Sequence, residues 1–225
     1  MKRLWEEVSS LFFRPLCPQC QTTLPARTAP GFCPACLGQL QACRSDRFYR
    51  RVLTPQPLDL FAWGNYDSPL RRAIAACKYH NRPQILRFLG TEIGQTWRCA
   101  PEVPPWQAQY PGLAVVPIPL HPQKYQSRGF NQAEELARGF SRVAGVPCRP
   151  DLLRRVRETK PQITAESRAE RLANLEQAFE AVAFPRPLLL CDDIYTSGAT
   201  IQTAIAACQA VHTVVAGVLV LARAS

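Results

Sequence analysis

The sequence lacks any long hydrophobic run. No uncharged apolar stretch among its 225 residues reaches the roughly 18 residues that a membrane-spanning helix needs. The longest such run, 213–222, is too short to span a bilayer and lies too far along the chain to be a signal peptide. Near the N-terminus, Glu6 and Glu7 precede a short apolar segment, which is not the order of a secretory signal. We therefore expect no membrane span and a cytoplasmic location.

Acidic residues and lysine are also scarce. The chain has 17 Asp and Glu against 27 Lys and Arg, so its formal net charge is +10, and only four of the basic residues are lysines. Arginine binds phosphate through a planar fork of donors. A phosphate-bearing partner, either nucleic acid or a phosphorylated small molecule, fits this composition, and so does an ordinary basic surface. The excess of basic over acidic residues is absent from the C-terminal segment 187–225, which has one basic and two acidic residues.

The ten cysteines are unevenly spread, because four of them form two Cys-x-x-Cys pairs separated by twelve residues: Cys17, Cys20, Cys33 and Cys36. This spacing predicts a tetrahedral Zn²⁺ site. Four thiolates leave the metal no open position, so the site is expected to fold the segment and not to catalyse. Two disulfides or a redox motif are alternatives, although a cytoplasmic location argues against disulfides. The other six cysteines have no ligand spacing, and we assign no role to Cys43.

Strands alternate with helices along the remaining sequence. Hydrophobic residues make up 47% of the chain, which excludes a mainly disordered protein. Continuous apolar runs predict an α/β fold, with a parallel sheet covered by helices on both faces. We place a zinc-binding module and basic linker at 1–52 and the α/β domain at 53–225.

The expected strands are 60–66, 113–120, 186–191 and 213–222, and the expected helices are 68–80, 84–98, 132–144 and 199–210. The module at 14–45 has no helical periodicity, 101–112 is expected to be a surface loop, and 151–177 is expected to be a charged mobile arm leading into a helix near 166–175.

The most informative segment is a buried strand that runs into two acids, a short hydroxyl-rich loop and a helix. Ligands of open α/β sheets bind at the carboxyl ends of strands, where Asp192 and Asp193 are expected to accept hydrogen bonds from ribose hydroxyls. Gly198 lets the backbone approach a ligand closely. Helix N-terminal N–H groups would cradle a phosphate, together with the hydroxyls of Thr196, Ser197 and Thr200. The alternative is an ordinary capped helix, but two acids at the end of a buried strand would then be costly.

This segment resembles the 5-phosphoribosyl 1-pyrophosphate (PRPP) signature of the type I phosphoribosyltransferases. The shared pattern is four apolar residues, two acids, two further residues and Thr-Ser-Gly-Ala-Thr, here residues 188–200. The resemblance implies a type I phosphoribosyltransferase-like sheet and PRPP bound together with Mg²⁺. It also implies catalytic roles for Asp192 and Asp193, and ligand contacts from Thr196, Ser197, Gly198, Ala199 and Thr200.

The whole set of motifs is similar to the ComF family, the ComFC and GntX-like proteins linked to natural transformation and DNA utilisation. The similarity runs from about residue 15 to 222 and rests on the Cys-x-x-Cys pairs, Cys77-Lys78-Tyr79, 116–121, 128–132, residues spaced over 154–179, and the Asp-Asp motif. It implies an N-terminal zinc finger, a phosphoribosyltransferase-type domain, and a role in handling internalised single-stranded DNA alongside other DNA-uptake proteins.

The resemblance also assigns residues to the ligand site. Arg128, Gly129, Phe130, Asn131 and Gln132 correspond to a pyrophosphate loop, and Lys78 is assigned to the same site. Residues 154–171 correspond to a hood in which Arg154, Arg157 and Lys160 would close over pyrophosphate, unless the segment is simply a solvated charged arm. His121 is interpreted as a polar loop residue with no role in the site.

The sequence features are consistent with three different functions. The first is a single-stranded DNA-binding protein that retains a PRPP-type site. The second is an active phosphoribosyltransferase of unknown acceptor, since enzymatic activity does not follow from membership of the family. The third is a regulator that senses PRPP and passes that signal to DNA binding. In the first, bases would stack on aromatic residues that lie near basic ones: Phe48, Tyr49, Trp63, Tyr79, Tyr125 and Phe130.

Overall fold

The computed structural model describes residues 16–24, 32–45, 47–52, 57–79, 82–156 and 178–224. The helices are α2 (Pro34–Ala42), α3 (Ser68–Tyr79), α4 (Pro83–Cys99), α5 (Val103–Gln107), α6 (Pro122–Arg128), α7 (Gln132–Ala144) and α9 (Ala199–Ala210), with a 3₁₀ turn η1 (Pro150–Leu152). The strands are β1 (Tyr49–Val52), β2 (Leu58–Asn65), β3 (Ala114–Pro117), β4 (Leu153–Arg155), β5 (Phe179–Ala181), β6 (Leu188–Tyr195) and β7 (Val215–Arg223).

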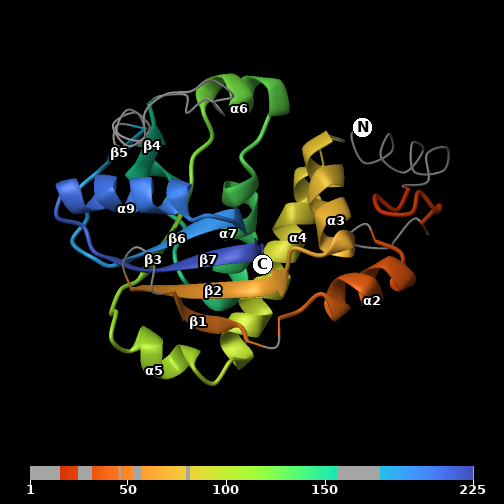
Figure 1. Cartoon of the computed structure of the whole chain (residues 1–225), viewed down its shortest axis with the longest axis horizontal. Coiled ribbons are helices and arrows are strands. Elements are labelled where there is room, and N and C mark those ends of the chain that lie inside the picture. The colour runs from red at the N-terminus through yellow and green to blue at the C-terminus, as the bar shows by residue number, and fades with distance from the viewer. Residues whose placement is uncertain are drawn as a thin grey trace, which may run out of the picture.

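A five-stranded sheet of order β1-β2-β7-β6-β3 forms the centre of the molecule (Figure 1). Strands β2, β7, β6 and β3 are parallel, and β1 pairs antiparallel with β2 at one edge. The predicted parallel α/β fold is therefore confirmed. The predicted division between residues 52 and 53 falls between two paired strands, and it stays a prediction.

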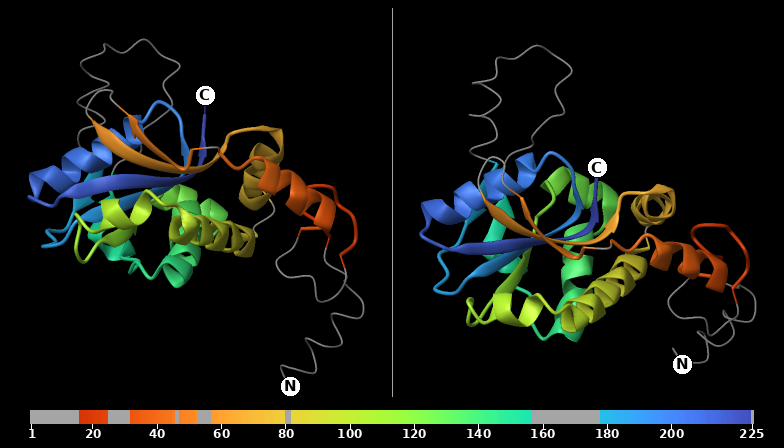
Figure 2. Two further views of the ribbon diagram at one scale, coloured as in Figure 1. Left: turned by 90° about the horizontal axis from the view of Figure 1, so that it is seen from below. Right: turned by 60° about the horizontal axis from the view of Figure 1, so that its bottom comes forward.

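Helices cover both faces of the sheet (Figure 2). One apolar core joins the sheet to α3, α4, α5 and α7 and continues into the cysteine-containing segment. A second core joins the opposite face to α9 and to the β4–β5 pair. Because the four parallel strands run in the same direction, their carboxyl ends meet along a single edge of the sheet, where the predicted ligand site belongs.

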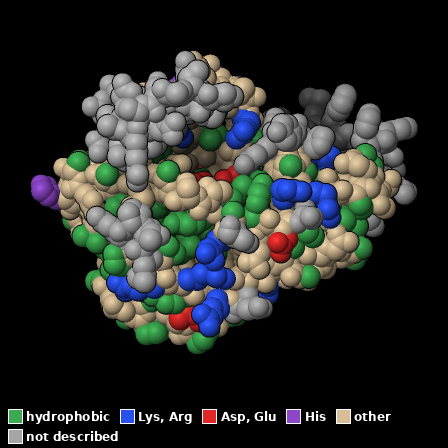
Figure 3. All heavy atoms as spheres, viewed as in Figure 1, with side chains coloured by type: hydrophobic (Ala, Val, Ile, Leu, Met, Phe, Trp, Pro, Cys, Tyr) green, Lys and Arg blue, Asp and Glu red, His purple; other side chains and the backbone are tan. Residues whose placement is uncertain are grey.

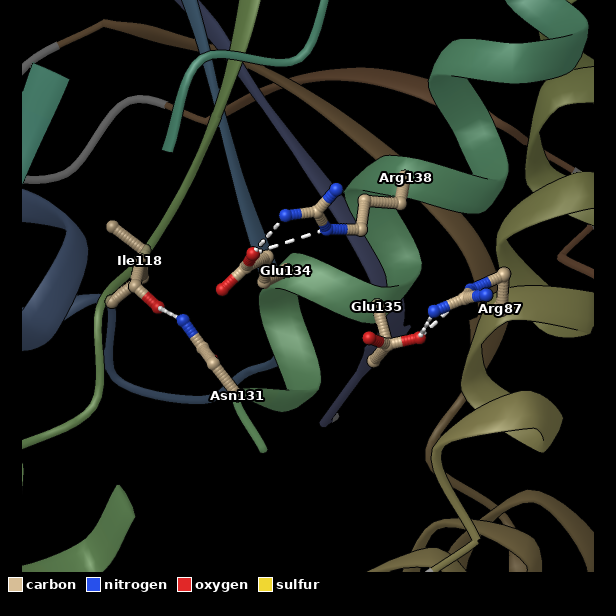
Figure 4. A network of polar contacts seen from close by, with 6 residues as sticks. All are labelled: Arg87, Ile118, Asn131, Glu134, Glu135 and Arg138. Atoms are coloured by element: carbon tan, nitrogen blue, oxygen red, sulfur yellow. Dashed lines mark hydrogen bonds and ion pairs between the residues drawn. The ribbon is translucent and has the colours of Figure 1, made fainter. Parts of the chain in front are cut away.

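Helices α4 and α7 approach unusually closely, and this contact fixes the position of α7. A side chain at Gly90 or Gly139 would overlap the backbone of the opposite helix, so both positions need glycine. An ion pair of 2.7 Å between the Arg87 guanidinium and Glu135 crosses the same contact (Figure 4). The N-terminus of α7 is thereby held at the carboxyl edge of the sheet, next to β3 and β6.

Several sequence predictions need correction. The segment 101–112 contains helix α5, because Trp106 packs against Phe61 at 4.7 Å between ring centroids and donates a 2.8 Å hydrogen bond from its ring nitrogen to Asp59. The cysteine module contains helix α2. Helix α6 was not predicted, and neither was the β4–β5 pairing at the two ends of the expected mobile arm. The helix expected near 166–175 lies outside the described residues.

Within the described ranges, no helix has both the length and the apolar character required to cross a bilayer.

Candidate functional site

Four cysteines form a candidate metal centre. The sulfur atoms of Cys17, Cys20, Cys33 and Cys36 all lie within 4.8 Å of one another, and those of Cys20 and Cys33 are 3.6 Å apart. A tetrahedral zinc ion with Zn–S bonds of about 2.3 Å separates its sulfur ligands by about 3.8 Å. The four thiols can therefore hold one metal ion such as zinc. None of the ten cysteines, all of which lie in the described ranges, forms a disulfide, so the structure contains neither of the alternative disulfides.

The backbone of each Cys-x-x-Cys pair is shaped for this purpose. The first pair lies in a turn closed by the Gln21 N–H, which donates to the Cys17 carbonyl at 2.8 Å. The second pair starts α2, where the Cys33 sulfur caps the helix by accepting from the Cys36 N–H at 3.4 Å. A helix N-terminus favours negative charge and therefore the thiolate form. Hydrogen bonds from Thr22 lower the pKa of Cys20 to about 6, whereas burial raises the pKa of Cys36.

The metal centre is continuous with the α/β core. Cys17 and Cys36 are buried in the same apolar cluster as Phe61 of β2. Cys43, to which we assigned no role from its spacing, ends α2 and donates its thiol hydrogen to the Gln39 carbonyl at 3.3 Å. The Cys43 carbonyl in turn accepts a 3.1 Å bond from the N–H of Asn65, the last residue of β2. Cys43 therefore joins the module to the sheet.

Strand β6 continues past the point where we expected it to end. Asp192 is paired with Val220 of β7 and the pairing extends to Tyr195, so the two acids lie within the strand. Both are half-buried, and the Asp193 N–H donates to an Asp192 carboxylate oxygen at 2.8 Å. Successive strand residues face opposite sides. Asp192 therefore shares the face of Leu190, which packs in the α9-side core.

A tight loop links β6 to α9. Thr196 and Ser197 are exposed, and Gly198 has a φ of +75°, a left-handed conformation that favours glycine. A Cβ atom at Gly198 would lie 2.6 Å from the Tyr195 hydroxyl oxygen. Helix α9 begins at Ala199, whose N–H donates to the Ser197 hydroxyl oxygen at 3.5 Å, while the N-cap residue Gly198 has no side chain to cap the other first-turn N–H groups. These groups, with Thr200 in the same turn, form an environment suited to an anion.

The segment assigned to the pyrophosphate loop has well-defined structural contacts. Gly129 ends α6 at a φ of +76°, and its N–H donates to the Tyr125 carbonyl at 2.7 Å. Asn131 caps α7 by accepting from the Ala133 N–H, and its side-chain amide donates to the Ile118 carbonyl at 3.0 Å (Figure 4). Asn131 thus ties the exit of β3 to the start of α7.

Three further residues belong to this segment. Phe130 is buried in the core, and Arg128 is half-exposed at the end of α6. Gln132 is 3% exposed, yet its side-chain NH₂ group has no hydrogen-bond partner within the described part of the chain. A buried donor in this state is costly unless a ligand or water satisfies it.

The structure describes only some of the other residues that the sequence analysis discussed in connection with the ligand site. Arg154 lies on β4 and forms an exposed ion pair with Glu180 of β5. Arg157 and Lys160 lie outside the described residues, and so does the side chain of Lys78, whose backbone belongs to α3. His121 caps α6, since its ring nitrogen accepts from the Gln123 N–H at 3.4 Å.

The structure changes the prediction about base stacking. Phe48, Trp63 and Phe130 are buried in the core, so they are not available to nucleic-acid bases. Tyr49 is half-buried and donates its hydroxyl hydrogen to Asp59 at 2.9 Å. Tyr125 is 49% exposed, whereas the side chain of Tyr79 lies outside the described residues.

Comparison with known proteins finds relatives that are named competence proteins or DNA utilization proteins. No protein-family model matches the chain. The chain is 29% identical over 209 residues to Competence protein F of Haemophilus influenzae, covering 85% of this chain and 89% of that protein. It is 41% identical over 98 residues to Competence protein ComFC of Streptococcus pneumoniae, covering 42% of this chain and 40% of that protein. It is 28% identical over 194 residues to DNA utilization protein YhgH of Escherichia coli O157:H7, covering 83% and 80%. These relatives, together with the cysteine cluster and the parallel sheet, support the resemblance to the ComF family.

Proposed function

We propose that this protein handles DNA taken up in natural transformation, and that it binds single-stranded DNA and a PRPP-type ligand. The competence and DNA-utilization names of its relatives support the process. The observation that carries the ligand site is the end of β6, where two half-buried carboxylates precede a glycine turn into the N-terminus of α9.

Each part of this region suits one part of a ribose phosphate. The first-turn N–H groups of α9 and the hydroxyls of Thr196, Ser197 and Thr200 would bind the 5′-phosphate, which the dipole of the 12-residue helix also favours. The Asp192 carboxylate, on the α9 side of β6, would accept hydrogen bonds from ribose hydroxyls. The buried NH₂ group of Gln132 at the same sheet edge would gain the acceptor it lacks among the described residues.

Magnesium fits this site through its donor atoms. Mg²⁺ prefers oxygen ligands and usually binds through one or two carboxylates and the phosphates of its substrate. Asp192 and Asp193 supply carboxylate oxygens beside the proposed phosphate loop. When bound, the ion would neutralise charge on the pyrophosphate, while the carboxylates of the chain would orient the ribose.

The cysteine cluster is proposed to hold a structural Zn²⁺ ion. Four thiol ligands fill a tetrahedral shell and leave no position for a substrate. Two of the ligands, Cys17 and Cys36, are buried in the main core. The metal would therefore stabilise the fold and keep the module docked against the sheet.

Charge supports the proposal that the partner is a polyanion. Residues 44–82 contain eight basic and three acidic residues. The side chains of Arg47 and Arg51 beside β2, and of Arg71 and Arg72 on α3, are exposed. Figure 3 shows basic side chains over β1 and beside α3 on one face of the molecule. A nucleic-acid strand could bind there through its phosphates, with an affinity that falls as salt rises.

Two measurements test this proposal. Fluorescence anisotropy at low salt should show that the protein binds a labelled oligonucleotide. In a salt series, the logarithm of the association constant should decrease linearly with the logarithm of the salt concentration. PRPP with Mg²⁺ should raise the melting temperature of the wild type but not that of Asp192→Asn. A matched control is Glu102→Gln, before α5 at the other end of the sheet, which should keep the full shift. An Asp192→Asn shift equal to that of the wild type would count against the site.

Phosphoribosyl transfer is the second candidate function, because the whole PRPP signature is present in residues 188–200. In such a reaction the bond from ribose C1 to pyrophosphate breaks, a bond from C1 to the acceptor forms, and pyrophosphate leaves. Release of pyrophosphate from labelled PRPP, tested with nucleobases and with nucleic acid, distinguishes the two functions. Ligand binding without release in every combination would leave a binding function alone.

A further inference from the structure

A cleft of about 380 Å³ lies beside the exit of β3, and neither the metal centre nor the β6–α9 loop includes it. Its walls come from the residues that follow β3, from α6, from the start of α7, and from β4. The volume falls within the range of about 300–1,000 Å³ that is usual for small-ligand sites. The cleft is one strand away from the Asp-Asp motif, since the Ile118 N–H donates to the Cys191 carbonyl at 2.8 Å.

One wall of this cleft is apolar and contains an exposed aromatic ring. Pro117, Pro119, Leu120 and Pro122 form the apolar surface, and Tyr125 of α6 lies beside them. Tyr125 is 49% exposed, and it is more exposed than any other Phe, Tyr or Trp whose side chain the structure describes. A flat ring at the edge of an apolar cleft is a surface on which a nucleobase can stack.

Positive charge surrounds the same cleft. Arg154 and Arg155 of β4 line it. Lys124 and Arg128 are outside the lining but belong to α6, the helix that provides Tyr125, one residue before it and three residues after it. The one acidic group in the lining, Glu134, forms a 2.6 Å ion pair with Arg138. The Arg154–Glu180 pair is exposed on both sides, so it contributes little stability, and Arg154 can exchange this partner for a phosphate.

We propose that this cleft binds one nucleotide unit of single-stranded DNA. The base would lie against the apolar wall and stack on the Tyr125 ring, and the flanking phosphates would contact Lys124, Arg128 and Arg154. Arg128 and Arg154 would then bind DNA phosphates and not the pyrophosphate to which the resemblance assigns them. This inference rests on the proposed function, in which single-stranded DNA is the partner. It places the bound strand next to β6. In that region Figure 3 shows acidic side chains at the floor of a hollow below α6.

The experiment measures the affinity of the full-length protein for a fluorescein-labelled oligothymidylate by anisotropy. Tyr125→Ala should weaken binding about 5- to 150-fold, the effect of losing one stacked base, whereas Tyr125→Phe keeps the ring and should stay within about twofold of wild type. Because Tyr125 is exposed, both variants should keep the melting temperature of the wild type. A matched charge control is Arg186→Gln, an exposed position before the amino end of β6, which should stay within about twofold.

Salt dependence separates base contacts from phosphate contacts. Tyr125→Ala should leave the slope of log affinity against log salt unchanged, while Lys124→Gln and Arg128→Gln should each reduce its magnitude by about 0.7. If the wild type binds single-stranded DNA and Tyr125→Ala binds it equally well, the cleft is not the binding site, but the proposed DNA-binding function still holds. If the wild type binds no single strand, both the proposed site and the proposed DNA-binding function are wrong. Equal affinity for an abasic strand, or equally tight binding of free thymidine monophosphate, would also overturn the proposal.

Discussion

Gly198 connects the proposed ribose-binding strand to the proposed phosphate-binding helix, and replacing it by alanine should cost both stability and ligand affinity. Its φ of +75° disfavours any side chain, at a cost of roughly 1–2 kcal/mol. An added Cβ would also lie 2.6 Å from the Tyr195 hydroxyl oxygen and 3.0 Å from the ring carbon that bears it. Tyr195 is buried, so it cannot turn away freely, and such overpacking costs about 1–3 kcal/mol.

The chain offers a matched control for the backbone contribution. Gly145 ends α7 at a φ of +73°, and an added Cβ there would meet nothing within 4 Å. Gly145→Ala should therefore lose about 1–2 kcal/mol, whereas Gly198→Ala should lose about 2–5 kcal/mol of the free energy of unfolding. Tyr195→Phe removes the closest atom, so combining it with Gly198→Ala should recover about 1 kcal/mol.

Urea unfolding followed by circular dichroism measures these differences, and PRPP affinity measured on the folded variants gives the functional effect. Gly198→Ala should weaken PRPP binding because the loop must shift away from Tyr195, while Gly145→Ala should not change it. Equal losses of stability for the two alanine variants, within about 0.5 kcal/mol, would refute the argument from the Tyr195 contact.

Three further predictions follow from other parts of the structure. Purified protein should contain one zinc per chain by atomic emission, and Cys33→Ser should lower both the zinc content and the melting temperature, because the metal centre shares the main core. Gly139→Ala should destabilise the protein by at least about 2 kcal/mol in urea unfolding, since its methyl group would overlap the backbone of α4. Burial raises the pKa of Cys148 to about 11, so its thiol stays protonated at pH 8. Mass spectrometry should therefore find it alkylated more slowly there than exposed Cys99, with its rate rising as the pH approaches 11.

Local patterns in the sequence were enough to predict the parallel sheet and the clustering of the four cysteines. The apolar runs at 188–191 and 213–222 are long and continuous, and they correspond to the central strands β6 and β7. The four metal-site cysteines are close in sequence, so their spacing alone brings the sulfur atoms together. In both cases the information lies within a short segment.

Features that depend on distant partners could not be predicted. Strand β6 extends through Asp192 because β7 pairs with it there, and the acids alone suggested a strand end. Helix α5 forms in a proline-rich segment because Trp106 donates a hydrogen bond to Asp59, which is 47 residues away in the sequence. The burial of Phe48 and Trp63 likewise follows from tertiary packing, so adjacency to arginine in the sequence was a poor guide to base stacking.

The central claim is that the end of β6 and the start of α9 bind a ribose phosphate. Isothermal titration calorimetry with PRPP and Mg²⁺ tests it most directly, using wild type, Asp192→Asn with Asp193→Asn, and the Glu102→Gln control. We expect one binding site per chain in the wild type and the control, and no detectable heat in the double variant at the same concentrations. Undiminished affinity in a folded double variant would contradict the account, and so would the absence of binding by the wild type.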